Sequence, residues 1–145
     1  MKYFTIEELI KSDTAARLNI DNIPSDEIIK NLETLIVELL DPFREAWGDA
    51  LRVTSGYRCE KLNSKIAGAS KTSAHLIGYA ADLVPTISSG KSTKELLKFA
   101  KEFLSISSLN WDQALLESNS NSFWLHLGLY NQNLEQRKQI KILNI

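Results

Sequence analysis

The chain has 145 residues, 43% of them hydrophobic and 24% charged, which is the composition of an ordinary globular domain with its own core. The formal net charge of −1 gives no electrostatic reason to expect nucleic-acid binding. The single cysteine, Cys59, excludes an intramolecular disulfide, and no apolar run approaches the ~20 residues that span a bilayer.

The first 24 residues contain one clear helix start. Thr5 and Glu8 form a capping box, which predicts a short helix running to about Ser12. The stretch from Asp13 to Ile23 is polar and is expected to be irregular. No basic segment leads into an apolar one, so we expect no signal peptide.

A long helix is predicted to begin at Pro24, where acidic residues occupy the first turn. Pro42 is expected to kink or end this helix because it lacks a backbone donor, although Phe43 and Trp47 could continue the apolar face as far as Gly48. The apolar residues at helical spacing are Ile28, Leu32, Leu35, Ile36, Leu39 and Leu40.

A short strand is predicted from Leu51 to Ser55, and it runs into Gly56 and then Arg58. From its residue type alone, Arg58 is equally well a solvated side chain or one that binds a ligand. A guanidinium can pair with a carboxylate through two parallel hydrogen bonds, which would suit the C-terminus of a peptide.

The segment from Ser73 to Asp82 is the most informative part of the sequence. It separates His75 from Asp82 by small or apolar residues, and Gly78 allows the backbone to turn before a strand that ends at Pro85. Aspartate is disfavoured within a strand, and a buried carboxylate needs a cation or several donors. A metal shared with His75 would meet that need.

A second helix is predicted from Ser92 onward, where Ser92 and Glu95 form another capping box. Its apolar stripe consists of Leu96, Leu97, Ala100, Phe103 and Leu104.

Two strands, 111–116 and 123–129, are predicted to form a hairpin. Trp124, His126 and Gly128 share one face of the return strand, because side chains alternate along a strand. The tail around 139–143 could add an edge strand.

His75 and His126 are the only two histidines in the chain. With Asp82 they offer two imidazoles and one carboxylate, a set that suits a catalytic zinc whose fourth position stays open for water. For His126 alone, a structural role would be the more common outcome. The combination with His75 and Asp82 favours the metal.

The pattern S-x-H-x-x-G-x-A-x-D at 73–82, followed by W-x-H at 124–126, resembles the zinc peptidases that include D-Ala-D-Ala carboxypeptidases, vancomycin-resistance dipeptidases and phage endolysins. The hedgehog signalling domain is a structural relative of these enzymes. S-G-Y-R at 55–58 and the segment from Trp111 add to the resemblance, which covers about Arg52 to Leu129. It is nearest to the compact members often found in phage genomes.

Together with the predicted elements, the resemblance implies an α+β fold in which two main helices back a small antiparallel sheet, with zinc on its open face. Strands beginning near Arg52, Ala80, Trp111 and Phe123 would contribute to the sheet. In the resembling proteins the N-terminal part lies against the catalytic domain. We therefore expect residues 1–145 to form a single domain on which 1–24 packs.

The resemblance further implies a zinc-dependent peptidase acting on the stem peptides of peptidoglycan, as a D-Ala-D-Ala carboxypeptidase or as an endopeptidase of the endolysin type. His75, Asp82 and His126 would hold Zn²⁺, Arg58 would bind the substrate's carbonyl or carboxylate, and Ser73 would contact substrate or a ligand. A non-catalytic zinc-containing binding module or virion component of the same fold is the alternative.

We expect a monomer without nucleic-acid or membrane partners. A protein that is made in the cytoplasm without a signal peptide would reach the cell wall through lysis, a holin or a virion.

The catalytic base departs from the family pattern. Many members carry a glutamate three residues before the second histidine, where this chain has Phe123. Glu117 is the candidate base, Asp112 is the second choice, and a chain without a functional base is the third possibility. In a tight hairpin centred on 119–120, Glu117 would lie about four residues along the strand from His126, roughly 13 Å away.

Overall fold

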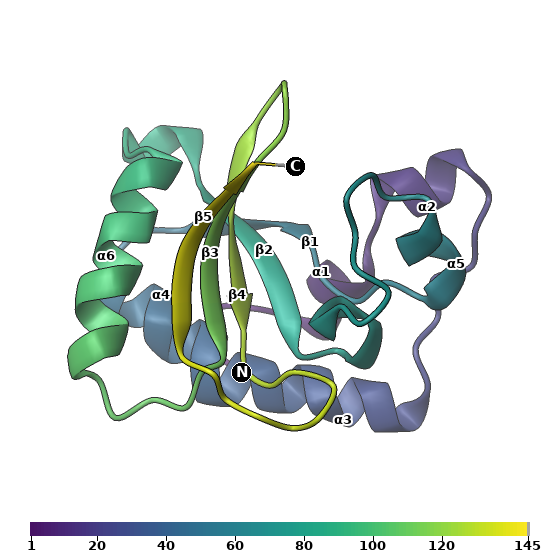
Figure 1. Cartoon of the computed structure of the whole chain (residues 1–145), viewed down its shortest axis with the longest axis horizontal. Helices are drawn as coiled ribbons and strands as arrows, with labels where there is room; N and C mark the ends of the chain where they lie inside the picture. The colour runs from purple at the N-terminus through teal and green to yellow at the C-terminus, as the bar shows by residue number, and fades with distance from the viewer. Residues whose placement is uncertain (145) are drawn as a thin grey trace.

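The computed structural model describes residues 1–144 and shows an α+β fold built on one sheet (Figure 1). The predicted fold class is therefore confirmed. The strands lie in the order β1-β2-β4-β3-β5. They are β1 (Leu51–Ser55), β2 (Ala80–Pro85), β3 (Gln113–Ser118), β4 (Phe123–Gly128) and β5 (Gln139–Asn144).

The first four strands pair antiparallel as expected, and the predicted hairpin and edge strand are present. The sheet is mixed, however, because β5 pairs parallel to β3, with Gln139 beside Gln113. A chain returning from β4 runs antiparallel to β4, but β2 and β3 already occupy both sides of that strand. The returning chain therefore takes the free edge of β3, to which it is parallel.

The first main helix is continuous from Asp26 to Trp47 and consists of α3 (Asp26–Leu35), a π-helical turn η1 (Ile36–Leu40) and α4 (Asp41–Trp47). Pro42 does not end it. The Asp41 N–H donates to the Ile36 carbonyl five residues back, and this wider turn carries the helix past a residue that has no N–H of its own. The helix ends at Gly48, which has a φ of 88°.

The second main helix, α6 (Thr93–Ile106), begins with the predicted capping box and packs on the face of the sheet opposite α2 (Asp13–Arg17) and α5 (Glu60–Ser64) (Figure 1). It meets α4 through aromatic rings: the Phe99 ring centroid lies 5.3 Å from those of both Phe43 and Trp47. The large side chains fully buried in the main core include Leu9, Leu32, Leu35, Ile36, Leu39, Leu40, Phe43, Leu83, Leu96, Leu125, Leu127 and Leu129.

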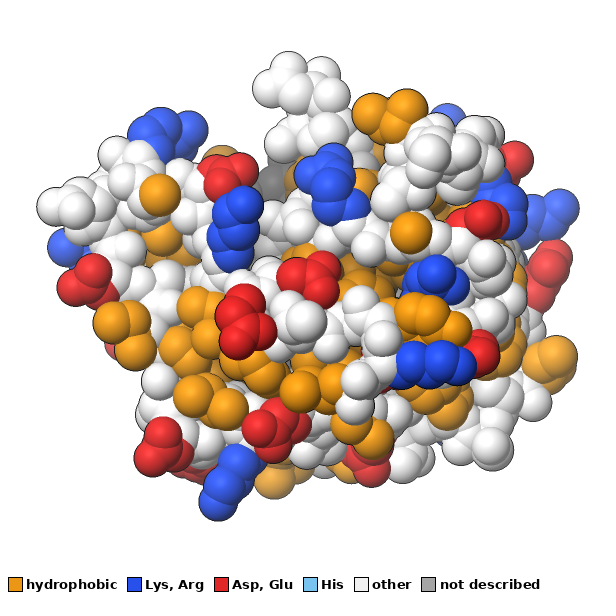
Figure 2. Space-filling model, turned by 180° about the vertical axis from the view of Figure 1, so that it is seen from behind, with side chains coloured by type: hydrophobic (Ala, Val, Ile, Leu, Met, Phe, Trp, Pro, Cys, Tyr) orange, Lys and Arg blue, Asp and Glu red, His pale blue; other side chains and the backbone are white. Residues whose placement is uncertain are grey.

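Seen from behind, the surface mixes hydrophobic side chains with acidic and basic ones (Figure 2). Charged residues such as Lys98, Lys101 and Glu102 keep one side of α6 in contact with solvent. Within residues 1–144, no helix combines the length and the apolar character needed to cross a bilayer.

The N-terminal segment packs on the rest of the chain through two short helices. The capping box of Thr5 and Glu8 opens α1 (Ile6–Ile10), as predicted. The prediction of an irregular stretch after it is wrong at α2, which begins where the Ser12 hydroxyl accepts a hydrogen bond from the Ala15 N–H. α2 shows that a hydroxyl cap can start a helix in a polar stretch without a long apolar stripe.

Asn22 ties this segment to the chain that follows β1. Its Nδ2 donates to the Ile10 carbonyl and to the Tyr57 carbonyl, at 2.9 Å each. Its Oδ1 accepts from the Cys59 N–H at 2.8 Å. One buried amide therefore holds the N-terminal segment and the turn after β1 in a fixed relation.

Gly56 lies at the closest approach between α1 and the turn after β1. A Cβ at this position would lie 2.2 Å from the Leu9 carbonyl oxygen, which also accepts a 2.6 Å hydrogen bond from the Tyr57 N–H. Only glycine fits at this distance.

We expect Gly56→Ala to lower the free energy of unfolding by about 1–3 kcal/mol, because α1 must move to admit the methyl group. The urea midpoint measures this loss. Gly128→Ala is the control, since the nearest atom there lies 3.7 Å away. Equal losses for the two variants would contradict the argument.

Candidate metal centre

Three titratable side chains meet on the face of the sheet turned away from α6. Asp82 in β2 lies directly opposite His126 in β4, and residues paired in this way point to the same face. His75 comes from the 3₁₀ turn η2 (Ala74–Ile77), which leads into β2 through Gly78. The structure thus brings together all three residues that the sequence proposed as metal ligands.

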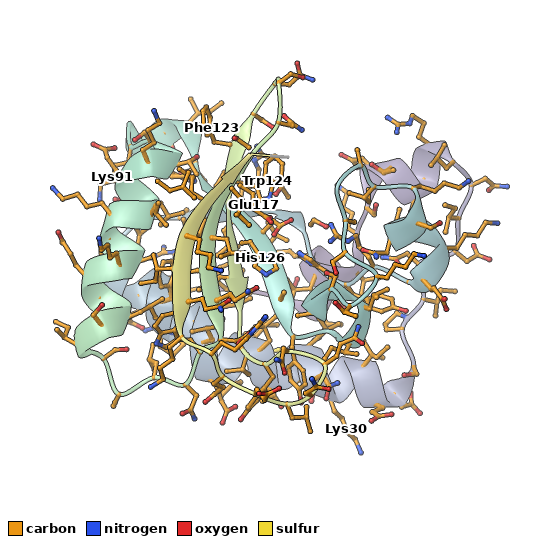
Figure 3. The ribbon with its side chains drawn as sticks, viewed as in Figure 1. Lys30, Lys91, Glu117, Phe123, Trp124 and His126 are labelled. Carbon is orange, nitrogen blue, oxygen red and sulfur yellow. The ribbon has the colours of Figure 1, made fainter. Side chains whose placement is uncertain are left out.

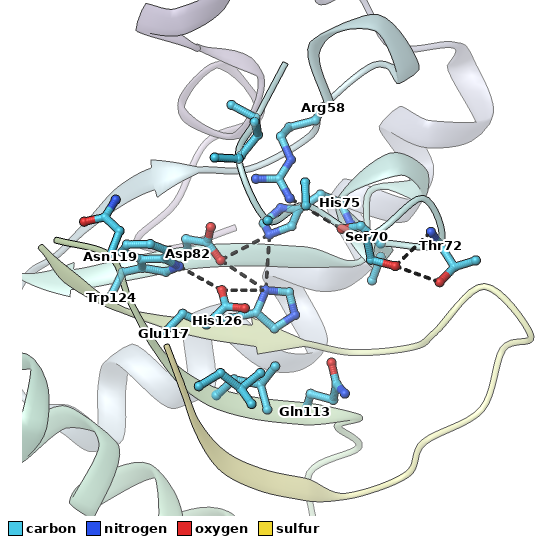
Figure 4. A pocket seen from close by; sticks show the side chains of 18 of the residues that line it. Arg58, Ser70, Thr72, His75, Asp82, Gln113, Glu117, Asn119, Trp124 and His126 are labelled. Carbon is cyan, nitrogen blue, oxygen red and sulfur yellow. Dashed lines mark hydrogen bonds and ion pairs between the residues drawn. The ribbon is translucent and has the colours of Figure 1, made fainter. Parts of the chain in front are cut away.

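The three ligand atoms form a nearly equilateral triangle (Figure 4). The Asp82 Oδ1 lies 3.1 Å from both the His75 Nε2 and the His126 Nδ1. The two nitrogens lie 3.2 Å apart, and all three side chains are buried. Ligand atoms around a tetrahedral zinc with bonds of about 2.0–2.1 Å stand roughly 3.3 Å apart, so the group has the size of a zinc site.

The hydrogen bonding of His75 leaves one of these contacts without a proton. Its Nδ1–H donates to the Gly56 carbonyl at 2.7 Å, so its Nε2 presents a lone pair to the Asp82 oxygen. Two acceptors then face one another in a buried site, an arrangement that a cation between them would stabilise. A backbone carbonyl on the far nitrogen is also the usual partner of a metal-ligating histidine.

The charges of the three groups suit the same role. Burial alone would raise the pKa of Asp82, but the positive charge and hydrogen bonds that the two histidines supply when they are protonated outweigh burial and hold that pKa well below its usual range. Burial lowers the pKa of His75. Burial opposes the charged form of His126 as well, but its hydrogen bond to Asp82 raises the pKa. The group therefore offers a carboxylate, a neutral imidazole and a second imidazole that must release a proton to a metal.

Glu117 stands much closer to the histidines than the sequence indicated. The hairpin turns through residues 119–122, so that Leu115 pairs with His126 and Glu117 is only two residues further along β3. The Glu117 Oε1 lies 4.0 Å from the His126 Nδ1 and accepts a 2.8 Å hydrogen bond from the Trp124 Nε1 (Figure 3). The expected separation of roughly 13 Å, which assumed a tight turn, is wrong.

Burial raises the pKa of the Glu117 carboxyl, and the charge of His126 offsets part of this rise. The side chain is 16% exposed at the cleft. It is thus a fourth titratable group beside the three proposed ligands, 4.0 Å from the His126 Nδ1.

Asp112, the second candidate base, is engaged elsewhere. It is 1% exposed, and its two oxygens accept from the Arg137 Nε at 2.9 Å and the Arg137 Nη2 at 2.6 Å. The Arg137 N–H donates to it as well. This ion pair fixes the start of β3 to the segment that precedes β5, which gives Asp112 a structural role.

Arg58 is buried beside the metal-site residues, and its hydrogen-bond partners within residues 1–144 are uncharged. Its Nε donates to the Asn63 Oδ1 at 3.1 Å, and its two terminal nitrogens lie 3.4 Å from the Ser55 hydroxyl and 3.5 Å from the Ser73 hydroxyl. Burial lowers the pKa of the guanidinium, and the charges of Asp82 and Glu117 counteract this. A buried cation bordering a cleft without a direct carboxylate partner is suited to receive an anion.

Ser73 contacts both His75 and Arg58. Its hydroxyl caps η2 by accepting from the His75 N–H at 3.2 Å, and the same oxygen faces Arg58. Ser73 therefore contacts the backbone of a proposed ligand residue, and its role toward substrate stays a prediction.

A single cleft of about 590 Å³ is lined by the three proposed ligands together with Glu117, Arg58 and Ser73. Sequence reasoning missed two of the contacts that organise it: the Asn63 amide that orients Arg58, and the indole N–H of Trp124 that holds Glu117. Asn63 had no local signal, because its role depends on how α5 packs. Trp124 did have one, since it shares a strand face with His126.

A family model described as peptidase M15 matches residues 2–108, which is more than half of the chain. The matched range includes Arg58, His75 and Asp82, whereas Glu117 and His126 lie beyond it. A search of curated proteins found no match.

We expect the protein to bind one zinc ion and His75→Ala and His126→Ala to weaken binding by more than about 100-fold, since even outer contacts to a metal ligand are worth 10–100-fold. Zinc should raise the melting temperature of the unaltered protein, but not that of either variant. Glu117→Gln is the matched control and should bind zinc normally. Unchanged zinc content in both histidine variants would disprove the site.

Proposed function

The chain belongs to the peptidase M15 family, and we propose that it is a zinc-dependent peptidase that cleaves peptidoglycan stem peptides. The family consists of zinc metallopeptidases that act on substrates of the peptidoglycan type. The observation that carries the proposal is the meeting of His75, Asp82 and His126 with a separate carboxylate, Glu117, 4.0 Å from His126.

When bound by these three residues, zinc would polarise a peptide carbonyl and lower the pKa of a water molecule. Glu117 accepts a proton from the attacking water and returns it to the leaving amine. The Trp124 indole holds one carboxylate oxygen at 2.8 Å, which keeps the carboxylate oriented. Because Glu117 and His126 belong to the same hairpin, the base and a metal ligand keep their relative position.

Arg58 binds the substrate beside this centre. In the part of the chain that the structure describes, its terminal nitrogens have long contacts to the Ser55 and Ser73 hydroxyls, which a substrate carboxylate or carbonyl can replace as acceptors. A free C-terminal carboxylate there would give a carboxypeptidase that removes a terminal D-Ala. A backbone carbonyl there would give an endopeptidase of the endolysin type.

The alternative is a binding or virion module that keeps zinc without hydrolysis. The absence of a glutamate at Phe123 favours it, and the position of Glu117 favours the enzyme. For either role, we propose that the monomeric protein reaches the cell wall through lysis, a holin or a virion.

Digestion of purified peptidoglycan with and without a chelator tests the function. Mass spectrometry of the released fragments distinguishes free D-Ala from new internal amino termini, and so distinguishes the two peptidase classes. Zinc-loaded protein that releases no fragment would support the non-catalytic module instead.

We expect Glu117→Gln to retain zinc and the fold but to lower kcat by about 10²–10⁴-fold, the usual contribution of general acid–base catalysis. Stem-peptide hydrolysis measures the rate, and metal analysis measures the zinc. Asp112→Asn, which alters the structural ion pair, should instead lower stability. Full activity in Glu117→Gln would exclude it as the base.

We expect Arg58→Lys to keep zinc and to lower kcat/KM by at least about tenfold, because an ammonium cannot form the two parallel hydrogen bonds of a guanidinium. Arg52→Lys is the control, since Arg52 lies on the exposed edge strand β1. Similar kinetics for both variants would remove Arg58 from substrate binding.

A further inference from the structure

The wall of the cleft formed by α2, α5 and the turn before α5 carries three cationic side chains. The proposed function uses only one of them, Arg58. The other two are Arg17, in the last turn of α2, and Lys65, the residue that ends α5. Both line the same cleft as the metal-site residues.

These cations are carried by one packed unit. Ala15, Ile20 and Leu62 form a small buried cluster that joins α2 to α5. Asn63 of α5 receives the Arg58 Nε–H at 3.1 Å, so α5 also positions Arg58. Figure 1 shows α2 and α5 side by side across the sheet from α6, and Figure 4 shows Arg58 next to His75 and Glu117 next to His126.

Among residues 1–144, no carboxylate forms an ion pair with the two cations that the proposed function leaves unused. Within residues 1–144, neither Arg17 nor Lys65 has a carboxylate oxygen within 4.0 Å, whereas Arg137, which also lines the cleft, is paired with Asp112. Among the described residues, the carboxylates that line the cleft are Asp82 and Glu117, and both have proposed roles at the metal site. Unpaired charges of one sign along a concave surface concentrate ligands of the opposite sign.

We propose that Arg17 and Lys65 form a second anion subsite, which binds a carboxylate of the substrate remote from the scissile bond. This inference rests on the proposed function and names its substrate class as an acidic peptide. Stem peptides differ at their third residue, which is either lysine or a diaminopimelate that adds a carboxylate to the side chain. Both residues carry a side-chain ammonium, but only diaminopimelate adds a carboxylate that can pair with Arg17 and Lys65, so this wall favours the diaminopimelate peptide.

The test uses two synthetic stem peptides that differ only at the third residue. Calorimetric titration into zinc-loaded Glu117→Gln should show binding of the diaminopimelate peptide at least about five-fold tighter at low salt, and the difference should shrink as salt rises. When Arg17→Gln and Lys65→Gln are added to this variant, the ratio of the dissociation constants of the two peptides should fall close to one. Both side chains are exposed, so these substitutions leave the core intact.

Lys61→Gln is the matched control, because Lys61 is an exposed lysine on α5 that does not line the cleft. It should preserve the preference. Equal binding of the two peptides, binding of neither, or a preference that survives loss of Arg17 and Lys65 would each overturn the subsite.

Hydrolysis by the unaltered protein is measured separately. Cleavage of both peptides at equal rates would support the proposed peptidase function and contradict the anion subsite. A binding preference that depends on Arg17 and Lys65, without cleavage of either peptide, would keep the subsite and overturn the peptidase.

Discussion

A carboxylate buried in the middle of the sheet, Asp82, is the constraint on which the rest of the site depends. Removing this charge from water is costly unless donors or a cation surround it. The β2–β4 pairing supplies His126 directly opposite, and the alternation that buries Leu125 and Leu127 forces His126 to the other face. A slip of one residue would reverse both faces, so the hydrophobic core fixes the register of the metal site.

The second histidine is fixed by backbone contacts that reach back to the N-terminal helix. The Gly56 carbonyl accepts from the His75 ring, and the Arg58 N–H donates to the His75 carbonyl at 3.1 Å. The same turn is held by the Leu9 carbonyl, which accepts from the Tyr57 N–H. Packing of α1 therefore contributes to the orientation of a proposed ligand on the far side of this turn.

The sequence predicted the features that depend on local patterns and missed those that depend on partners distant in the chain. Capping boxes predicted α1 and α6, and the ten-residue motif identified His75 and Asp82. The pairing of β5 with β3 could not be read locally, because it depends on which sheet edge is free. The position of Glu117 relative to His126 depends on how many residues form the turn between β3 and β4. The sequence prediction assumed a turn centred on 119–120, whereas the turn spans 119–122, and the predicted distance was therefore wrong.

The register of the β3–β4 hairpin places a candidate base beside His126 although the usual glutamate is absent. Residues three apart lie on one side of a helix but on opposite faces of a strand. A glutamate at Phe123 would therefore point away from the face that carries His126. Glu117 is instead the diagonal neighbour of His126 on β3, a relation within reach of a long side chain. In this chain the carboxylate beside the second histidine therefore comes from the adjacent strand.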